Sequence, residues 1–307
     1  MLAANTLKGN WGTLMLPVNA DESIDFLRLA EEIDYLVAAG IDGIYSNGTA
    51  GEFHNQLEDE FYIIQQLLSE KCRAAKMRFQ IGASHPSPLI SLHRLQRTIE
   101  LQPDAFQVIL PDWVVADAGE QVVFLQTMAK AAAGIPLVLY NPPHAKQVLL
   151  PADFERIHAA VPQLIGIKVA SGNHDWFAKM RVHATGISVF VPGHFLATGV
   201  KEKVASGACS NIACLSPPGA QSWWNLIVTD INAALEIQER ILLFIDECIL
   251  PFKDKGFSNP ALDKFLAAVG GWCSVGTRLR WPYKWIDESE VDAVRRKAKK
   301  YLPEFFL

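Results

Sequence analysis

Residues 164–169 read LIGIKV, a run of strand length in which Lys168 is the only polar side chain. Residues 151–161 before it and residues 173–183 after it carry apolar side chains at helical spacing, the second stretch less regularly. The run lacks the alternation of polar and apolar side chains that marks a strand with one exposed face. A strand buried on both faces between two helices is typical of a parallel α/β sheet.

The same pattern recurs along the first two thirds of the chain. Seven more apolar runs of strand length, bounded by Gly, Pro or Asn, lie at residues 11–18, 43–46, 78–83, 105–110, 137–140, 188–191 and 210–215. Helical stretches separate them at residues 23–39, 58–72, 88–101, 119–133 and 195–206, the first with Asp21 as a candidate cap and Gly40 as a stop. Eight alternating strands predict an α/β fold, a closed (β/α)8 TIM barrel. A doubly wound sheet would carry a glycine-rich turn after its first strand, and residues 12–17 are not one.

The pattern changes after Leu215. Residues 223–250 read as one long helical run, and further helices are expected near residues 260–268 and 288–301. We therefore expect a (β/α)8 catalytic barrel over residues 1–222 and a helical C-terminal domain over residues 223–307.

Composition excludes several classes of partner. The 307 residues carry 28 basic and 33 acidic side chains, and no basic stripe interleaved with aromatic residues indicates a nucleic-acid surface. Apolar runs are interrupted before they reach membrane-spanning length, and the first ten residues lack the pattern of a secretory signal. Five scattered cysteines do not form a disulfide framework. We expect a cytoplasmic protein with neither a nucleic-acid nor a membrane partner.

Active-site residues of such a barrel come from the C-terminal ends of its strands. Lys168 stands in an apolar strand, and a desolvated lysine yields the neutral amine that attacks a ketone. The ordinary alternative is a lysine that reaches solvent or pairs with Glu52 or Asp175. Tyr140 ends the preceding strand, where its hydroxyl could relay protons to an imine or could simply fill the core.

The turn Gly48-Thr-Ala-Gly51 offers backbone N–H groups suited to a carboxylate, although glycine-rich turns are more often only turns. Metal chemistry has little support, because the eight histidines are dispersed and form no His-x-His or His-Glu-x-x-His motif. Cys209 and Cys214 are expected on opposite faces of the last strand and its end, as packing residues. No metal site is predicted.

Three motifs on three expected strands carry a resemblance: Gly48-Thr-Ala-Gly-Glu52, Tyr140-Asn-Pro-Pro143 and Gly166-Ile-Lys-Val-Ala-Ser-Gly172. In this order and at these intervals they resemble the dihydrodipicolinate synthase / N-acetylneuraminate lyase family. The resemblance extends over nearly the whole chain. It implies a metal-independent class I lyase or aldolase on a barrel with C-terminal helices. The covalent imine on its lysine replaces a cofactor, and the assembly is a homo-oligomer, a tetramer or a dimer.

The resemblance also implies roles for single residues. Lys168 would form an imine with the keto carbon of pyruvate or another small 2-oxo acid, and Tyr140 would be the general acid and base, hydrogen-bonded to Thr49. The backbone N–H groups of Thr49 and Ala50 would hold the substrate carboxylate, and the carbonyl of Ile212 would line the site. The residues expected to contact substrate are Gly48, Ala50, Trp113, His144, Gly193, His194 and Ile212.

Departures from the family pattern bear on the substrate. The second hydroxyl residue of the family's turn is Ala50 here, which removes one bond to the carboxylate. Where the synthase branch has an arginine and a relaying tyrosine, this chain has Ala145 and Trp113, and an indole cannot relay a proton as a phenol does. Dihydrodipicolinate synthesis is therefore not expected.

The positions with which sialic acid lyases hold a polyhydroxyl tail are His194, Phe195 and Cys214 here, which predicts a less polar pocket. The leading hypothesis is a Schiff-base lyase or aldolase that cleaves or forms a C–C bond in a 2-oxo acid. One alternative is a dehydratase of a ketodeoxy sugar acid that uses the same imine, weakly favoured by Phe53. Another is a catalytically inactive barrel that binds a 2-oxo acid, suggested by Ala50 and Trp113.

Overall fold

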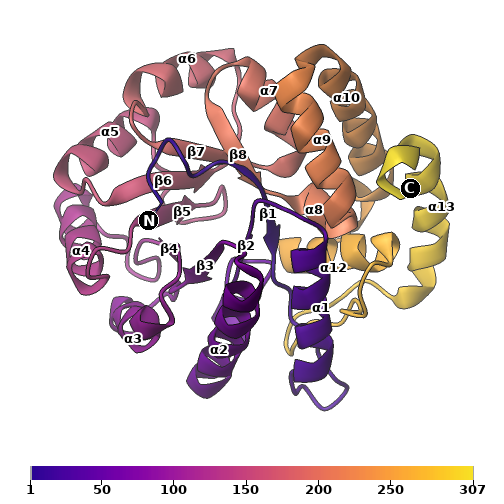
Figure 1. Cartoon of the computed structure of the whole chain (residues 1–307), viewed down its shortest axis with the longest axis horizontal. Coiled ribbons are helices and arrows are strands. Elements are labelled where there is room, and N and C mark those ends of the chain that lie inside the picture. The colour runs from indigo at the N-terminus through magenta and orange to yellow at the C-terminus, as the bar shows by residue number, and fades with distance from the viewer. Residues whose placement is uncertain (1, 307) are drawn as a thin grey trace.

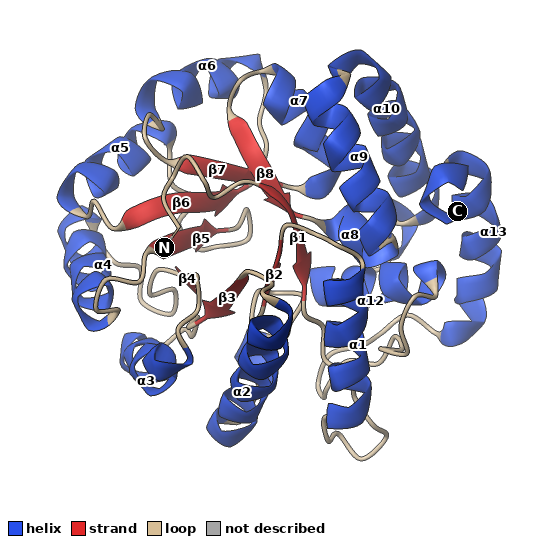
Figure 2. Ribbon diagram, in the orientation of Figure 1, coloured by secondary structure: helices blue, strands red, loops and turns tan. Residues whose placement is uncertain are grey.

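The computed structural model describes residues 2–306, and its centre is a closed barrel of eight parallel strands (Figure 1, Figure 2). The strands follow one another around the barrel in chain order, and the last pairs with the first through Trp11 and Cys209. Their bounds are β1 (Gly9–Thr13), β2 (Gly43–Tyr45), β3 (Phe79–Gly82), β4 (Ala105–Val108), β5 (Leu137–Asn141), β6 (Leu164–Val169), β7 (Ser188–Val191) and β8 (Ala205–Cys209). The predicted (β/α)8 TIM barrel is confirmed.

Helices surround the barrel and extend it on one side (Figure 2). Those that follow the first seven strands are α1 (Phe26–Ala38), α2 (Glu58–Ala75), α3 (Pro88–Thr98), α4 (Ala118–Ala131), α5 (Pro151–Ala160), α6 (His174–His183) and α7 (Leu196–Lys201). The later ones are α8 (Asn211–Leu215), α9 (Pro217–Thr229), α10 (Ile231–Cys248), α11 (Leu250–Asp254), α12 (Asn259–Gly270) and α13 (Val291–Tyr301). None of the helices within residues 2–306 is long and apolar enough to cross a membrane.

The eighth strand is not where the sequence predicted it. Residues 211–215 form helix α8, whose N-terminus is capped by the Ser210 hydroxyl accepting from the Ala213 N–H at 3.1 Å, and β8 lies just before it. A short buried helix and a buried strand are both continuous apolar runs, so periodicity does not separate them. The helix predicted over residues 195–206 is too long at its C-terminal end, because α7 ends at Lys201 and β8 begins at Ala205.

Two other boundaries differ because of side-chain caps. The long run over residues 223–250 is two helices, and Asp230 between them accepts from the N–H groups of Asn232 and Ala233. The cap of α1 is Asp25, not Asp21, which instead accepts from Ser23.

The C-terminal helices pack on the side of the barrel where β8 meets β1 (Figure 1). Helix α12 lies against α8 and α13, and α10 lies against α7 and α9. The predicted boundary between residues 222 and 223 falls inside α9, so the division into two domains stays a prediction. Because α8 directly follows β8, this arrangement brings helix side chains over the C-terminal mouth of the barrel.

Candidate active site

Lys168 lies on β6 opposite Tyr140 of β5, as the register of the two strands requires. Its Nζ atom donates a hydrogen bond of 3.2 Å to the Tyr45 hydroxyl, and it lies 4.4 Å and 4.2 Å from the ring centroids of Tyr45 and Tyr140. Neither carboxylate considered as an ion-pair partner is available, since Asp175 pairs with Lys179 and Glu52 with Lys264. Lys168 is therefore held between two aromatic rings, and no carboxylate among residues 2–306 forms an ion pair with it.

Two opposing effects act on the pKa of Lys168. Burial lowers it because the ammonium loses its water, whereas ionised Tyr45, Cys209 and Tyr140 raise it, and over a full titration the upward effects prevail. Burial also raises the pKa of Tyr45 and of Cys209, so both groups are neutral near pH 7. With these partners neutral, burial favours the nucleophilic amine of Lys168, whereas the hydrogen bond to the Tyr45 hydroxyl favours the ammonium.

The Tyr140 hydroxyl lies 3.0 Å from Oγ1 of Thr49, which is the contact that the resemblance implied. Thr49 belongs to the turn over residues 47–52. That turn is closed by hydrogen bonds from the Gly51 N–H to the Gly48 carbonyl and from the Glu52 N–H to the Thr49 carbonyl. Within residues 2–306 the N–H groups of Thr49 and Ala50 have no acceptor. Two adjacent free N–H groups beside an amine make a concave site for a carboxylate.

Close approach explains the glycine at position 48. A Cβ atom there would lie 2.7 Å from the Tyr45 ring and 3.6 Å from Nζ of Lys168. The turn begins and ends with residues in the left-handed region, Asn47 at φ 53° and Glu52 at φ 50°. The turn is also fixed to helix α12, because buried Glu52 forms a 2.5 Å ion pair with Lys264 of that helix.

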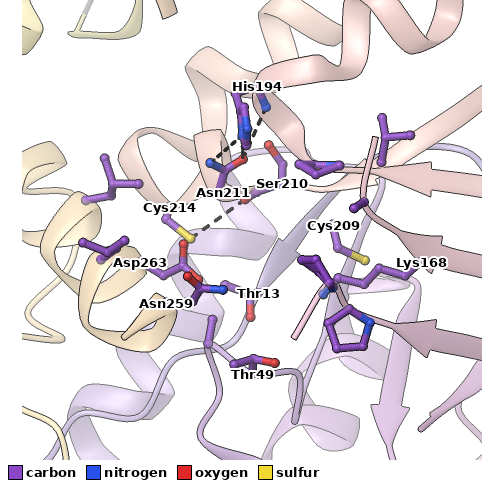
Figure 3. A pocket seen from close by; sticks show the side chains of 18 of the residues that line it. Thr13, Thr49, Lys168, His194, Cys209, Ser210, Asn211, Cys214, Asn259 and Asp263 are labelled. Carbon is purple, nitrogen blue, oxygen red and sulfur yellow. Dashed lines mark hydrogen bonds between the residues drawn. The ribbon is translucent and has the colours of Figure 1, made fainter. Parts of the chain in front are cut away.

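These groups line a cavity of about 350 Å³ at the C-terminal mouth of the barrel (Figure 3). Of the predicted site residues, Lys168, Tyr140, Thr49, Ala50 and His194 line it. The ring of His194 lies 3.0 Å from the Asn211 amide, and burial lowers the pKa of the imidazole.

Other predicted contacts are not found in this cavity. Ile212 is buried outside it and its carbonyl accepts from the Ser216 N–H at 3.1 Å, so it does not line the cavity as expected. Gly193 lies behind the lining, where a Cβ atom would meet the Ser210 hydroxyl. Trp113 is 81% exposed on the loop after β4, and His144 lines a second cavity of about 110 Å³ that shares Thr49 and Tyr140.

Several lining residues were missed. Thr13 and Tyr45 end β1 and β2, so the strand-end rule could have found them. Cys209 was missed because the eighth strand was misplaced: it ends β8, whereas Cys214 lies in α8, so their predicted placement on opposite faces of one strand is wrong. Both are buried, as expected of packing residues, and both also line the cavity. Asp263, on α12, also lines the cavity, and no sequence motif near it marks it as an active-site residue.

Comparisons with known proteins find relatives along almost the whole chain. The sequence model of the dihydrodipicolinate synthetase family matches residues 6–301. The chain is 28% identical over 297 residues to 4-hydroxy-tetrahydrodipicolinate synthase of Neisseria gonorrhoeae (strain ATCC 700825 / FA 1090), covering 95% of this chain and 98% of that protein.

Two solved structures share the fold at low identity. One is YagE, a prophage protein of the dihydrodipicolinic acid synthase family from E. coli K12, in complex with pyruvate (TM-score 0.82, 19% identity, 96% of this chain and 98% of that one). The other is N-acetylneuraminate lyase from Fusobacterium nucleatum (TM-score 0.82, 19% identity, 96% and 99%).

Proposed function

The chain belongs to the dihydrodipicolinate synthetase family, a family of Schiff-base lyases of the pyruvate aldolase type, and on that premise we propose what its own site does. We propose that Lys168 forms an imine with a pyruvate-type 2-oxo acid and that the protein forms or cleaves the C–C bond next to it. One observation carries the proposal: a partly buried amine, with no carboxylate partner among residues 2–306, lies over the ring of Tyr140, whose hydroxyl is linked to that of Thr49.

The proposed reaction uses each of these groups. The free N–H groups of Thr49 and Ala50 bind the substrate carboxylate, which directs the keto carbon to the amine of Lys168. Attack by the amine on the keto carbon gives a carbinolamine. Tyr140 then donates a proton to the carbinolamine hydroxyl, which leaves as water. The resulting iminium accepts the electron pair released when the adjacent carbon loses a proton to the Tyr140 oxygen, giving an enamine and restoring the Tyr140 hydroxyl.

Bond formation follows in the synthetic direction. The enamine carbon bonds to the carbonyl carbon of an aldehyde, whose oxygen takes a proton from Tyr140 and becomes a hydroxyl. Water then hydrolyses the iminium, which releases the product keto acid and restores the amine. Cleavage is the reverse sequence. Because the iminium is itself the electron sink, the proposed chemistry needs no metal, and dialysis against EDTA should leave activity unchanged.

The proposed reaction is not dihydrodipicolinate synthesis. Ala145 has no charge with which to bind a second carboxylate, and Trp113 is 81% exposed on its loop. The apolar segment of Trp113, Val114 and Val115, which are 81%, 77% and 46% exposed, supports the proposed homo-oligomer. Sedimentation analysis of the wild type against Trp113→Lys would test that assembly. The cytoplasmic location stays a prediction.

The deciding experiment is borohydride reduction in the presence of pyruvate, followed by peptide mass mapping. A reduced pyruvyl adduct on Lys168, absent from Lys168→Ala, is the expected result. An adduct on another residue, or full turnover by Lys168→Ala, would refute the imine assignment. Failure with pyruvate and with sugar-derived 2-oxo acids alike would mean a barrel without turnover.

Product analysis then separates the two lyase reactions. Free pyruvate and an aldehyde indicate C–C cleavage, whereas a product with an unchanged carbon chain indicates dehydration of a ketodeoxy sugar acid.

A further inference from the structure

The cavity has two chemically different walls. The ends of the barrel strands supply the imine side, whereas the C-terminal helices supply the opposite side with aliphatic residues. These are Ile245, Ile249, Leu250, Leu262 and Leu266. A substrate held by its carboxylate at the Thr49 turn must place the part beyond the keto carbon against this wall. A chain of hydroxyl groups would lose its hydrogen bonds to water there without replacement.

Asp263 is the single carboxyl group on the cavity lining (Figure 3). It projects from α12 on the side away from Lys168, next to Asn259 and Cys214. Within residues 2–306 its carboxyl makes neither a hydrogen bond nor an ion pair, whereas the next residue, Lys264, is fully paired. A partly buried carboxyl without a partner is costly, and a ligand group that hydrogen-bonds to it removes the cost.

The other polar groups of the distal half are engaged or lie at its mouth. His194 and Asn211 bond to each other, and the Ser210 hydroxyl accepts from the Ala213 N–H. Lys253 and Asn259 are exposed. Among residues 2–306, the distal half of the lining has one carboxyl and no arginine, and its lysine, Lys253, is exposed at the mouth, so it disfavours an acceptor with a second carboxylate or a phosphate.

We propose that Asp263 is a specificity-determining residue that hydrogen-bonds a hydroxyl group on an otherwise apolar acceptor aldehyde. This inference rests on the proposed imine chemistry and deepens it by naming the class of second substrate. The aldehyde carbon bonds to the enamine carbon at Lys168 while the aliphatic wall covers the body of the acceptor. The hydroxyl that Asp263 binds takes no part in the bond change. Burial raises the pKa of Asp263 to about 7, so its carboxyl is present in donor and acceptor forms near neutrality.

The test measures pyruvate addition to matched aldehydes: benzaldehyde, its three monohydroxy isomers, glyceraldehyde and succinic semialdehyde. We expect at least one hydroxybenzaldehyde to exceed benzaldehyde in kcat/KM by about tenfold or more, the value of one well-placed hydrogen bond to a buried group. Asp263→Leu should abolish this preference, so that the ratio of kcat/KM for the hydroxybenzaldehyde to kcat/KM for benzaldehyde falls to about one. Asp263→Asn, which keeps the shape of the side chain, should retain part of the preference for the hydroxybenzaldehyde.

Asp254→Asn is the matched control, because it removes the same charge from an exposed position on α11. Its preference should equal that of the wild type. Borohydride trapping of pyruvate on every variant distinguishes the two proposals. If the wild type yields no adduct, the imine proposal fails and this one with it. If adducts form but Asp263→Leu keeps the preference, or glyceraldehyde or succinic semialdehyde is the best acceptor, only the assignment of Asp263 is overturned.

Discussion

Nζ of Lys264 lies 2.5 Å from Oε1 of Glu52, and both side chains are buried. The pair joins helix α12 to the turn that carries Thr49, and Lys264 also donates to the Arg278 carbonyl at 2.7 Å. Burial lowers the pKa of Lys264, while the charge of Glu52 opposes that shift. The helix that closes the cavity and the turn that we propose binds the substrate carboxylate are thus fixed to each other.

Lys264→Met should lower the free energy of unfolding by about 3–5 kcal/mol, because it leaves the buried Glu52 carboxylate without its countercharge. Urea unfolding followed by circular dichroism measures the change. The double variant Lys264→Met/Glu52→Gln should recover part of the loss, since no buried charge remains. Equal stability of the wild type and the single variant would show that the pair contributes nothing.

Tyr140→Phe should reduce kcat by about 100-fold, within the range typical of a lost general acid and base. The KM for the 2-oxo acid should change little, because the carboxylate site of the turn is untouched. Steady-state kinetics together with the rate of borohydride-trapped adduct formation provide the measurement. Thr49→Val, which removes the 3.0 Å hydroxyl partner, should show a smaller decrease in the same direction. A Tyr140→Phe enzyme with wild-type kcat would assign the hydroxyl to structure.

Ala50→Ser should lower the KM for pyruvate about fivefold, because the added hydroxyl reaches a carboxylate held at the turn and contributes about 1 kcal/mol. Ala50 lines the cavity next to Thr49 and is only 5% exposed, so its new hydroxyl has little water to lose. Pyruvate saturation curves at a fixed aldehyde concentration measure the effect. An unchanged or higher KM would mean that the carboxylate binds elsewhere.

Gly48→Ala should slow imine formation by at least about tenfold, because overpacking moves the Tyr45 ring on which the Lys168 amine rests. The trapping rate with pyruvate measures it. Gly119→Ala on α4 is the control, since its nearest neighbour is the end of the Asp117 side chain at 3.3 Å. Identical trapping rates in both variants and the wild type would contradict the close approach.

Asp263 predicts a pH dependence of stability. Its pKa is raised by burial from 3.8 to about 7, against the opposing charge of Lys168, and the buried Cys214 thiol beside it stays neutral because its own pKa is raised. Between pH 3.8 and about pH 7 the native state therefore binds more protons at Asp263 than the unfolded chain does. The wild type therefore loses about 3 kcal/mol of unfolding free energy relative to Asp263→Asn as pH rises from 4 to 7. Urea titrations of both proteins across this range test it, and parallel curves would exclude the shift.

Strand β6 could be predicted to the residue because LIGIKV is an uninterrupted apolar run with a polar turn after it. Strand β8 could not, since Ala205–Cys209 holds small residues and Gly207, whereas the apolar run after it is helical once Ser210 caps it. Side chains at strand ends, such as Lys168 and Tyr140, follow from topology alone. The position of Asp263 depends on how α12 packs over the barrel, which no local pattern encodes.

Asp263 and Lys264 are neighbours on α12, yet one faces the cavity and the other the buried ion pair. Acceptor preference and attachment to the barrel are therefore encoded at adjacent but separable positions. Mutant libraries confined to Leu262, Asp263 and Leu266 would explore new acceptors without disturbing the covalent step. Any substitution at Lys264 would instead alter every reaction the barrel performs. In a scaffold divided in this way, substitutions on the C-terminal helices can change the acceptor specificity while the imine-forming residues stay the same.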